Sequence, residues 1–479
     1  MKSNIKNKFS NKKTSNNKET NGVQTLLGDP KKAIITLAIP MIIAMSFQTL
    51  YNLTDAIWVS GIGASALAAV GFVFPFFFMA LAIASGLGVG GGSAISRYIG
   101  ANDKKGADSV AVHTLIIMVI ISFLFTIFLF VFSYDIFKAI GAGEILDMAT
   151  LYAQIISLGT ISIFFSFIAN SILRAEGDAK RAMYAMVLGT ILNIILDPIF
   201  IYTLNMGVAG AAWATILSMT ISSLLLFNWL FMKKDTFVSI YFSNFHFDKI
   251  IIKDILRISF PASVMQLSMS ITMLIMNIII INIGVIDGTG NPQDGIAVFT
   301  VGWRIVQMAT MPLIGIATAV VSVTGAAYGA KDYFKLDTAY MHSIKIGFII
   351  EAIIALFVYF FAPFIVLGFT MSESSAALSD DIVNFLRIAV LFFPGIAFGM
   401  LSSSMFQGAG KGVNALTVTI FRTIILTLPL SWLLSITLGL GLTGAWWGMV
   451  IGNLSGSFTA FAWGKLHINK LKKSSNPSI

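Results

Sequence analysis

The chain has 479 residues, of which 57% are hydrophobic and only 11% charged, and its mean hydropathy is +0.86. So apolar a composition excludes a water-soluble protein and indicates an integral membrane protein. The chain has no cysteine, which excludes disulfides, thiolate metal sites and a cysteine nucleophile. The formal charge of +9 does not indicate a nucleic-acid partner, because the basic residues follow a membrane topology.

Residues 1–28 are rich in Lys, Asn and Ser, and we expect them to form a disordered cytoplasmic leader outside the fold. The rest of the chain contains apolar stretches longer than about 18 residues, which favours spanning helices over barrel strands. Twelve such spans are expected, at about 34–59, 66–96, 110–134, 147–173, 183–204, 208–232, 254–284, 296–325, 339–366, 381–406, 413–437 and 441–464. The predicted fold class is therefore an all-α integral membrane protein with twelve transmembrane helices.

The basic residues predict the orientation. All but four of the 31 Lys and Arg residues fall in the two termini and in alternate loops. The exceptions are Lys138, in an opposite loop, and Arg304, Arg387 and Arg422, inside spans. Because Lys and Arg accumulate on the cytoplasmic side, we expect both termini to be cytoplasmic in a multi-pass protein of the cell (inner or cytoplasmic) membrane.

Three pairs of segments repeat across the midpoint. IPMIIAMSFQTLYN from Ile39 corresponds to FPASVMQLSMSITM from Phe260, YIGANDKKGAD to AYGAKDYFKLD, and GVAGAAWATILS to GLTGAWWGMVIG. Parallel repeats of this kind pack as two pseudo-symmetric six-helix lobes around a central cavity. Because one chain supplies both lobes of the cavity, we expect a monomer. The predicted parts are a lobe over 29–232, a cytoplasmic linker over 233–253, a lobe over 254–464 and a cytoplasmic tail over 465–479.

Two acids stand near the middle of spans in the first lobe. Asp55 has Tyr51 four residues earlier, and Asp197 has Asn193 four residues earlier, so each pair shares one helix face. A charged side chain at the bilayer centre costs about 2.5–3.5 kcal/mol. This cost favours a functional site over a purely structural role, in which the acids would only hydrogen-bond neighbouring helices. The counterparts in the second lobe, Met276 and Leu430, are apolar. The chemistry is therefore expected in the first lobe alone.

The first-lobe polar residues are all oxygen ligands. Asn170 and Thr215 add neutral oxygens at similar depth. Such a set suits Na⁺, and two neighbouring carboxylates also suit a proton, so both ions stay open and a Na⁺ site at Asp55 and Asp197 is one alternative. We expect no other metal and no organic cofactor.

Other residues carry secondary predictions. Pro40 removes a helix hydrogen bond and predicts a bend in the first span. A cavity able to accept small lipophilic molecules is expected to include polar and thioether side chains, since these adapt to varied ligands. The candidates are Gln48, Asn52, Met45, Met186, Met265 and Met269. In the second lobe, Glu351 with Arg304 and Arg422 is expected to form a buried structural pair.

The spans, the repeat and several motifs resemble the multidrug and toxic compound extrusion (MATE) transporters over about residues 30–465. The motifs are the YNLTDAIWVSGIG opening, RAEGDAKRA at 174–182, LNIILDPIFIY and GVAGAAWAT. With its acids in the first lobe, the chain is similar to the DinF-like branch. The resemblance implies a bend of the first helix at Pro40 and a cation site formed by Tyr51, Asp55, Asn170, Asn193, Asp197 and Thr215.

The function expected is a cation-coupled antiporter, driven by H⁺ or Na⁺, that exports lipophilic and often cationic compounds by alternating access across the lipid bilayer. One alternative is a flippase of lipid-linked precursors, whose cavity would need several cations to hold a phosphate headgroup. Only Arg304, Arg387 and Arg422 fall inside spans, and all three lie in the second lobe. The other is an intramembrane aspartyl protease using Asp55 and Asp197. The repeat favours transport over any enzyme.

Overall fold

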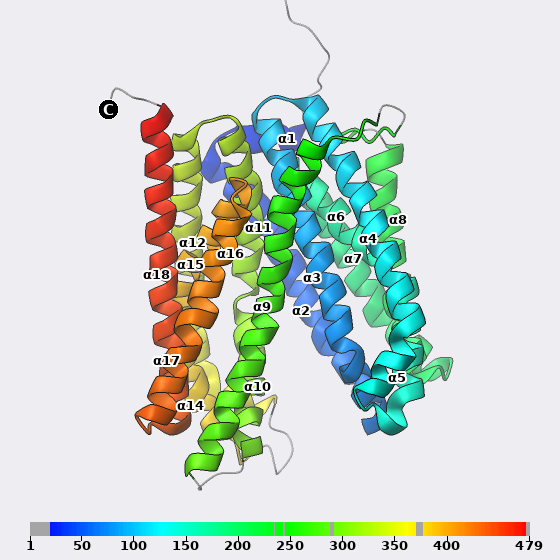
Figure 1. The fold of residues 1–479 in the computed structure, drawn as a ribbon, viewed down its shortest axis with the longest axis vertical. Helices are drawn as coiled ribbons and strands as arrows, with labels where there is room; N and C mark the ends of the chain where they lie inside the picture. The colour runs from blue at the N-terminus through cyan, green and yellow to red at the C-terminus, as the bar shows by residue number, and fades with distance from the viewer. Residues whose placement is uncertain (1–19, 234, 243–244, 288–291, 370–376, 476–479) are drawn as a thin grey trace, which may run out of the picture.

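The structure, a computed structural model, describes residues 20–233, 235–242, 245–287, 292–369 and 377–475, which are mostly helical (Figure 1). Among these residues, ten helices are long and apolar enough to cross a membrane, and one bent helix pair supplies an eleventh crossing. The last helix, α18 (Gly441–Ser475), has 35 residues, which is long enough for a twelfth crossing, and it carries several Gly, Ser and Thr residues. The predicted all-α membrane fold is confirmed.

The first lobe runs from α2 to η3. Its fourth crossing is bent by 47° where Gly159 separates α5 from α6, and its fifth ends in a π-helical turn, η2, directly after Pro198. Pro198 has no N–H to donate, so the carbonyl of Ile194 lacks its α-helical partner just before this turn. The elements are α2 (Pro30–Ser60), α3 (Ala64–Gly100), α4 (Lys104–Ala139), η1 (Gly143–Ile145), α5 (Leu146–Leu158), α6 (Thr160–Ala175), α7 (Ala179–Pro198), η2 (Ile199–Thr203), α8 (Gly207–Phe227) and η3 (Asn228–Met232).

The second lobe runs from α9 to α18. Its second crossing is divided at Thr310, just before Pro312, whereas the equivalent α3 is continuous. The elements are α9 (Lys249–Asp287), α10 (Pro292–Ala309), α11 (Met311–Gly329), α12 (Tyr333–Leu367), α14 (Ser379–Ala389), η4 (Val390–Phe392), α15 (Phe393–Gly408), α16 (Gly412–Ile420), η5 (Phe421–Thr427), α17 (Leu428–Trp432), η6 (Leu433–Thr437) and α18.

The sequence repeat is also a structural repeat. Asp103 and Asp332 each accept a hydrogen bond from a backbone N–H three residues later, at 2.8 and 2.9 Å, and so begin α4 and α12 in the same way. The residue before each aspartate, Asn102 or Lys331, adopts a positive φ of 58° or 57°. Equivalent sequences therefore build equivalent turns in the two lobes.

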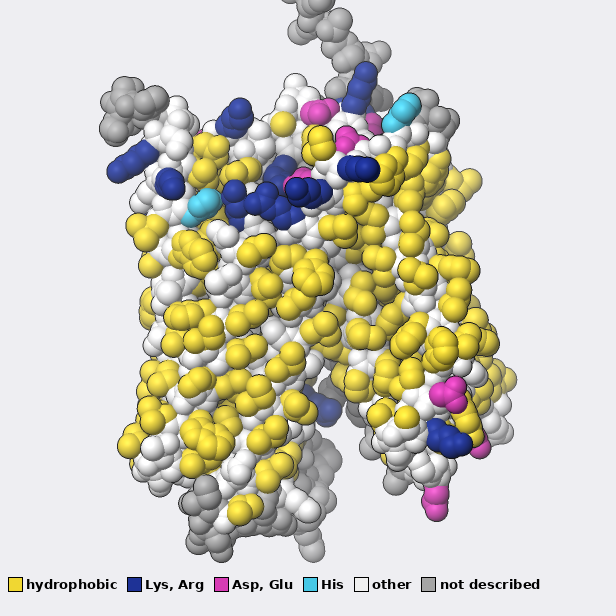
Figure 2. Space-filling model, in the orientation of Figure 1, with side chains coloured by type: hydrophobic (Ala, Val, Ile, Leu, Met, Phe, Trp, Pro, Cys, Tyr) yellow, Lys and Arg dark blue, Asp and Glu magenta, His cyan; other side chains and the backbone are white. Residues whose placement is uncertain are grey.

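The two lobes meet along α2 and α3 of the first and α9 and α11 of the second. On α3, Gly86 and Gly90 leave room for Ser263 and Ser259 of α9, whose hydroxyls would lie within 2.1 Å of an added Cβ. The seam is tightest at the end that carries the C-terminus and most Lys and Arg side chains, which we call the basic end. At the opposite end the lobes separate around a cleft (Figure 2).

Three segments are helical where the sequence predicts no span. Residues 20–28, expected within a disordered leader, include the short helix α1 (Asn21–Leu27), whose Val23 and Leu26 are buried. Its Gly22 lies against the backbone of Glu176 and Gly177. The helix α9 begins at Lys249, inside the expected linker, and α18 continues to Ser475, into the expected tail.

Candidate functional site

A buried polar group lies inside the first lobe where α7 meets α8. Asp197 and Asn193 come from α7 and Thr215 from α8, and all three are almost fully buried. The Asn193 Nδ2 donates to Asp197 Oδ1 and to Thr215 Oγ1, at 3.4 Å in each case. The four-residue spacing on α7 thus produces the contact that the sequence predicts, and Thr215 joins it from the neighbouring helix.

Two amide oxygens of residues predicted for the cation site lack donors in the part of the chain that the structure describes. Asn170, on α6, is buried and donates its Nδ2 to the Ser166 carbonyl at 2.8 Å. Within the described part of the chain, neither Asn170 Oδ1 nor Asn193 Oδ1 receives a hydrogen bond. Buried oxygens without donors are costly, and an amide oxygen beside a carboxylate, as at Asn193 and Asp197, is the kind of acceptor that suits a cation.

The remaining residues predicted for this site lie on α2, which packs against α7. Tyr51 is half-buried there. The side chains of Asp55 and Asn52 lie outside the described residues, so the geometry of the site rests on Asp197, Asn193 and Thr215. Pro40 is buried within α2, which stays helical from Pro30 to Ser60.

The predicted substrate-contacting residues are spread over three helices. Met45 and Gln48 on α2 and Met186 on α7 are half-buried. On α9, the sulfur of Met265 accepts long contacts from Gln407 Nε2 at 3.9 Å and Ser403 Oγ at 4.0 Å. The Met265 side chain therefore packs inside the second lobe, whereas Met269 is 41% exposed.

The pair expected in the second lobe does not form. Among the described residues no ion pair joins Glu351 to an arginine: Glu351 and Arg422 are both buried, and both carboxylate oxygens and the Arg422 Nε and Nη1 lack hydrogen-bond partners. Arg304 is exposed instead of buried. Similar depth along two spans does not fix which way the side chains point, and this explains why that prediction was wrong.

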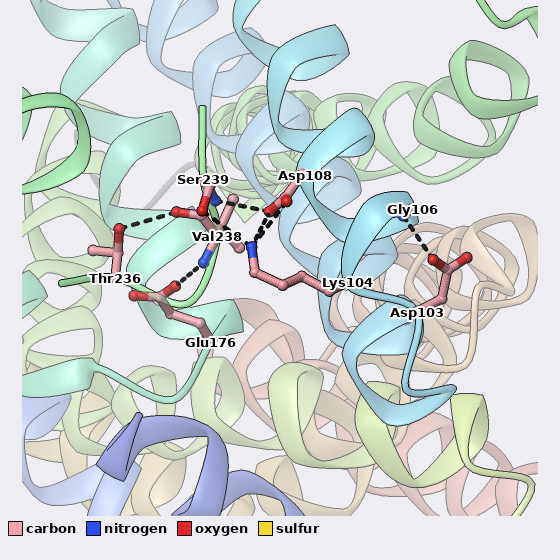
Figure 3. A network of polar contacts seen from close by, with 8 residues as sticks. All are labelled: Asp103, Lys104, Gly106, Asp108, Glu176, Thr236, Val238 and Ser239. Carbon is pink, nitrogen blue, oxygen red and sulfur yellow. Dashed lines mark hydrogen bonds and ion pairs between the residues drawn. The ribbon is translucent and has the colours of Figure 1, made fainter. Parts of the chain in front are cut away.

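The basic end holds a polar network that the sequence did not reveal (Figure 3). Lys104 Nζ contacts Asp108 Oδ2 at 2.9 Å and Ser239 Oγ at 3.0 Å, and the Ser239 N–H donates to Asp108 Oδ1 at 2.7 Å. The Val238 N–H donates to Glu176 Oε2 at 2.9 Å. These bonds attach the segment after the first lobe to α4 and to the end of α6.

Glu176 and Asp235 are among the acids of this region whose pKa values are shifted. Burial raises the pKa of Glu176 to about 8, against the opposing effect of the hydrogen bond from Val238. The hydrogen bond from Arg181 lowers the pKa of Asp235. The RAEGDAKRA motif contains Glu176, but nothing in its spacing indicates that the carboxyl is buried.

Two pseudo-symmetric helical lobes, a cleft open at one end and a buried carboxylate–amide–hydroxyl group in one lobe are the features of a secondary transporter. The chain belongs to the MatE family, whose model matches residues 40–199 and 261–433. It is therefore a membrane transporter and not an enzyme.

Relatives support the same assignment. The chain is 27% identical to the multidrug export protein MepA of Staphylococcus saprophyticus over 433 residues, covering 88% of this chain and 90% of that protein. It is 26% identical to MepA of Staphylococcus aureus over 425 residues, again covering 88% and 90%.

Solved structures are more similar still. One is a MOP superfamily transporter from Pyrococcus furiosus, and another is the outward-facing conformation of a multidrug resistance MATE family transporter. Each is 49% identical to this chain with a TM-score of 0.91, and the alignment covers 95% of this chain and all of the other.

Proposed function

We propose that the protein is a cation-coupled antiporter that exports lipophilic, often cationic compounds, and that H⁺ or Na⁺ binds at Asp197 with Asp55, Asn193 and Thr215. The observation that carries the proposal is the buried group on α7 and α8, where Asp197 accepts from an uncharged amide. A buried carboxylate costs several kcal/mol in its charged form, so a proton or Na⁺ that neutralises it binds favourably.

Hydrogen bonding between helices is the simpler role for such a group. In that role the amide oxygens of Asn170 and Asn193 would accept hydrogen bonds from neighbouring helices. Within the described chain neither oxygen receives a hydrogen bond. Oxygens held without donors suit a site that accepts a cation during the transport cycle. The export of drugs is supported by the MepA relatives, which are multidrug export proteins.

Coupling requires that ion and substrate favour different states. An ion that bound the outward-open and inward-open forms equally would move nothing. In our proposal the cleft faces the cell exterior and the basic end faces the cytoplasm of the cell (inner) membrane, as the distribution of Lys and Arg predicts. An ion entering the first lobe from outside then disfavours bound substrate and releases it. One pH unit supplies about 1.4 kcal/mol per proton, enough for about a tenfold substrate gradient.

The test is gradient-driven transport by the wild-type protein in liposomes. Ethidium, a lipophilic cation, is loaded, and its efflux is followed by fluorescence under an imposed pH gradient, an imposed Na⁺ gradient or neither. Efflux under one gradient, absent from protein-free liposomes, identifies the coupling ion. Efflux that ignores both gradients contradicts antiport. Movement of a labelled lipid-linked phosphate without ethidium efflux would favour the flippase alternative.

A further inference from the structure

The first two turns of α9 present an unusual outer face at the basic end. Lys249, Ile252, Lys253, Leu256 and Arg257 follow the i, i+3, i+4, i+7, i+8 spacing and so share one side of the helix. The opposite side is buried against α3 through residues such as Ile255 and Ser259. The three cations and Leu256 are exposed, and Ile252 is half-buried. We call these five residues the α9 basic face.

These residues line a groove. Together with Phe247 they line a shallow hollow of about 650 Å³ that is open to the outside. Figure 2 shows Lys and Arg side chains gathered over the upper part of the seam, above a broad field of hydrophobic side chains. The groove thus offers positive charge above and apolar surface below.

The cations of this face are available to a ligand. In the described chain no ion pair engages Lys249, Lys253 or Arg257. The neighbouring acids are committed elsewhere, since Asp254 pairs with Arg97 at 2.8 Å and Asp248 Oδ1 accepts from the Ile250 N–H at 2.7 Å. The three positive charges face outward, and among the described residues no ion pair joins them to a carboxylate.

The position of the face relates it to the membrane surface. With 39 residues, α9 is about 58 Å long, so it exceeds the roughly 30 Å hydrocarbon core and carries its first turns into the headgroup layer. One turn further, Phe260 is 69% exposed, and Leu256 above it is 42% exposed. An amphipathic ligand with an anionic head and an apolar tail matches this order of charge and apolar surface.

We propose that the α9 basic face binds the headgroup of an anionic phospholipid, with the acyl chains running past Leu256 and Phe260. The site lies beside the seam of the lobes, because the Arg97–Asp254 ion pair joins α3 to α9 at the same level. It is separate from the first-lobe polar group and does not depend on the proposed transport function.

The test is native mass spectrometry of the purified, detergent-solubilised protein with phosphatidylglycerol or phosphatidylcholine. The variant K249Q/K253Q/R257Q removes the three cations. The matched control, K105Q/K470Q/K473Q, removes three exposed lysines of the same end and leaves the α9 face intact. At about fivefold per basic residue, we expect the first variant to bind phosphatidylglycerol on the order of 100-fold more weakly, and the control to bind like wild type.

Three results would overturn the proposal. They are equal binding of both lipids by the wild type, unchanged phosphatidylglycerol binding by the α9 variant, and an equal loss in both variants, which would reflect net charge alone. In a competition experiment, inorganic phosphate is added at the same concentration as phosphatidylglycerol. If phosphate displaces the lipid, the groove binds a free anion and not a lipid headgroup. Equal melting temperatures of the variants in phosphatidylcholine establish that all are folded.

Discussion

Closure of the basic end depends on a reciprocal backbone contact between the lobes. A Cβ at Gly100, the last residue of α3, would lie 1.9 Å from the Ala326 carbonyl oxygen, and a Cβ at Gly329 of α11 would lie 1.9 Å from the Arg97 carbonyl oxygen. Both obstacles are main chain and cannot rotate away. The change Gly100→Ala should therefore force the two helices apart by about 1.5 Å or more to reach normal contact.

The expected consequence is a shift toward the form open at the basic end. Overpacking of a tight contact costs about 1–3 kcal/mol, and this corresponds to a change of about 5- to 150-fold in the ratio of closed to open forms. Gly71→Ala is the matched control, because it lies on the same helix and a Cβ there meets nothing within 4 Å.

The assay is a spin-label distance measurement across the basic end. The native chain has no cysteine, so labels attach only at introduced K180C and K470C, one exposed site on each lobe. Gly100→Ala should add a population at longer distance that wild type and Gly71→Ala lack. An unchanged distance distribution in Gly100→Ala, or the same change in Gly71→Ala, would refute the reasoning.

Two further predictions concern the segments attached at this end. The pKa of Glu176 is raised to about 8 from an ordinary 4.5, so the contribution of this carboxyl to stability is complete below pH 4.5 and is lost as the pH rises through 8. The melting temperature of the wild type should therefore fall between pH 5 and 9, and Glu176→Gln should flatten this decline. Equal slopes of melting temperature against pH in the two proteins would contradict the prediction. Leu26 is buried, so Leu26→Asp should release α1 and raise the rate of its amide hydrogen exchange about 10- to 100-fold. Gln24 is exposed, and Gln24→Asp should leave that rate unchanged. Slow exchange retained in Leu26→Asp would argue against docking of α1.

The architecture could be predicted from the sequence because its signals are local or periodic. Long apolar runs predicted the spans, and the segments that repeat across the midpoint predicted two equivalent lobes. In the structure the repeated segments begin their helices in the same way, at Asp103 and Asp332. The four-residue spacing of Asn193 and Asp197 fixes their contact, since residues i and i+4 are neighbours on any helix.

The remaining features depend on tertiary contacts. Helix α1 has only seven residues, and its order comes from packing of Val23 and Leu26 against distant segments. The burial of Glu176 depends on where the chain around Val238 returns. For Glu351 and Arg422 the position along each span predicts the depth of the side chain but not its direction around the helix axis, so their failure to pair could not be predicted.

The central claim, that the first-lobe acids couple an ion gradient to export, is tested most directly by ethidium efflux from liposomes containing Asp197→Asn. Asn keeps the shape of the side chain but cannot take up a proton or offer a charge to Na⁺. The control is Asp135→Asn, an exposed aspartate on α4. We predict that gradient-driven efflux is lost in Asp197→Asn, as in Asp55→Asn, and kept in Asp135→Asn, with all variants folded and inserted. Normal gradient-driven efflux by Asp197→Asn and Asp55→Asn would contradict the account.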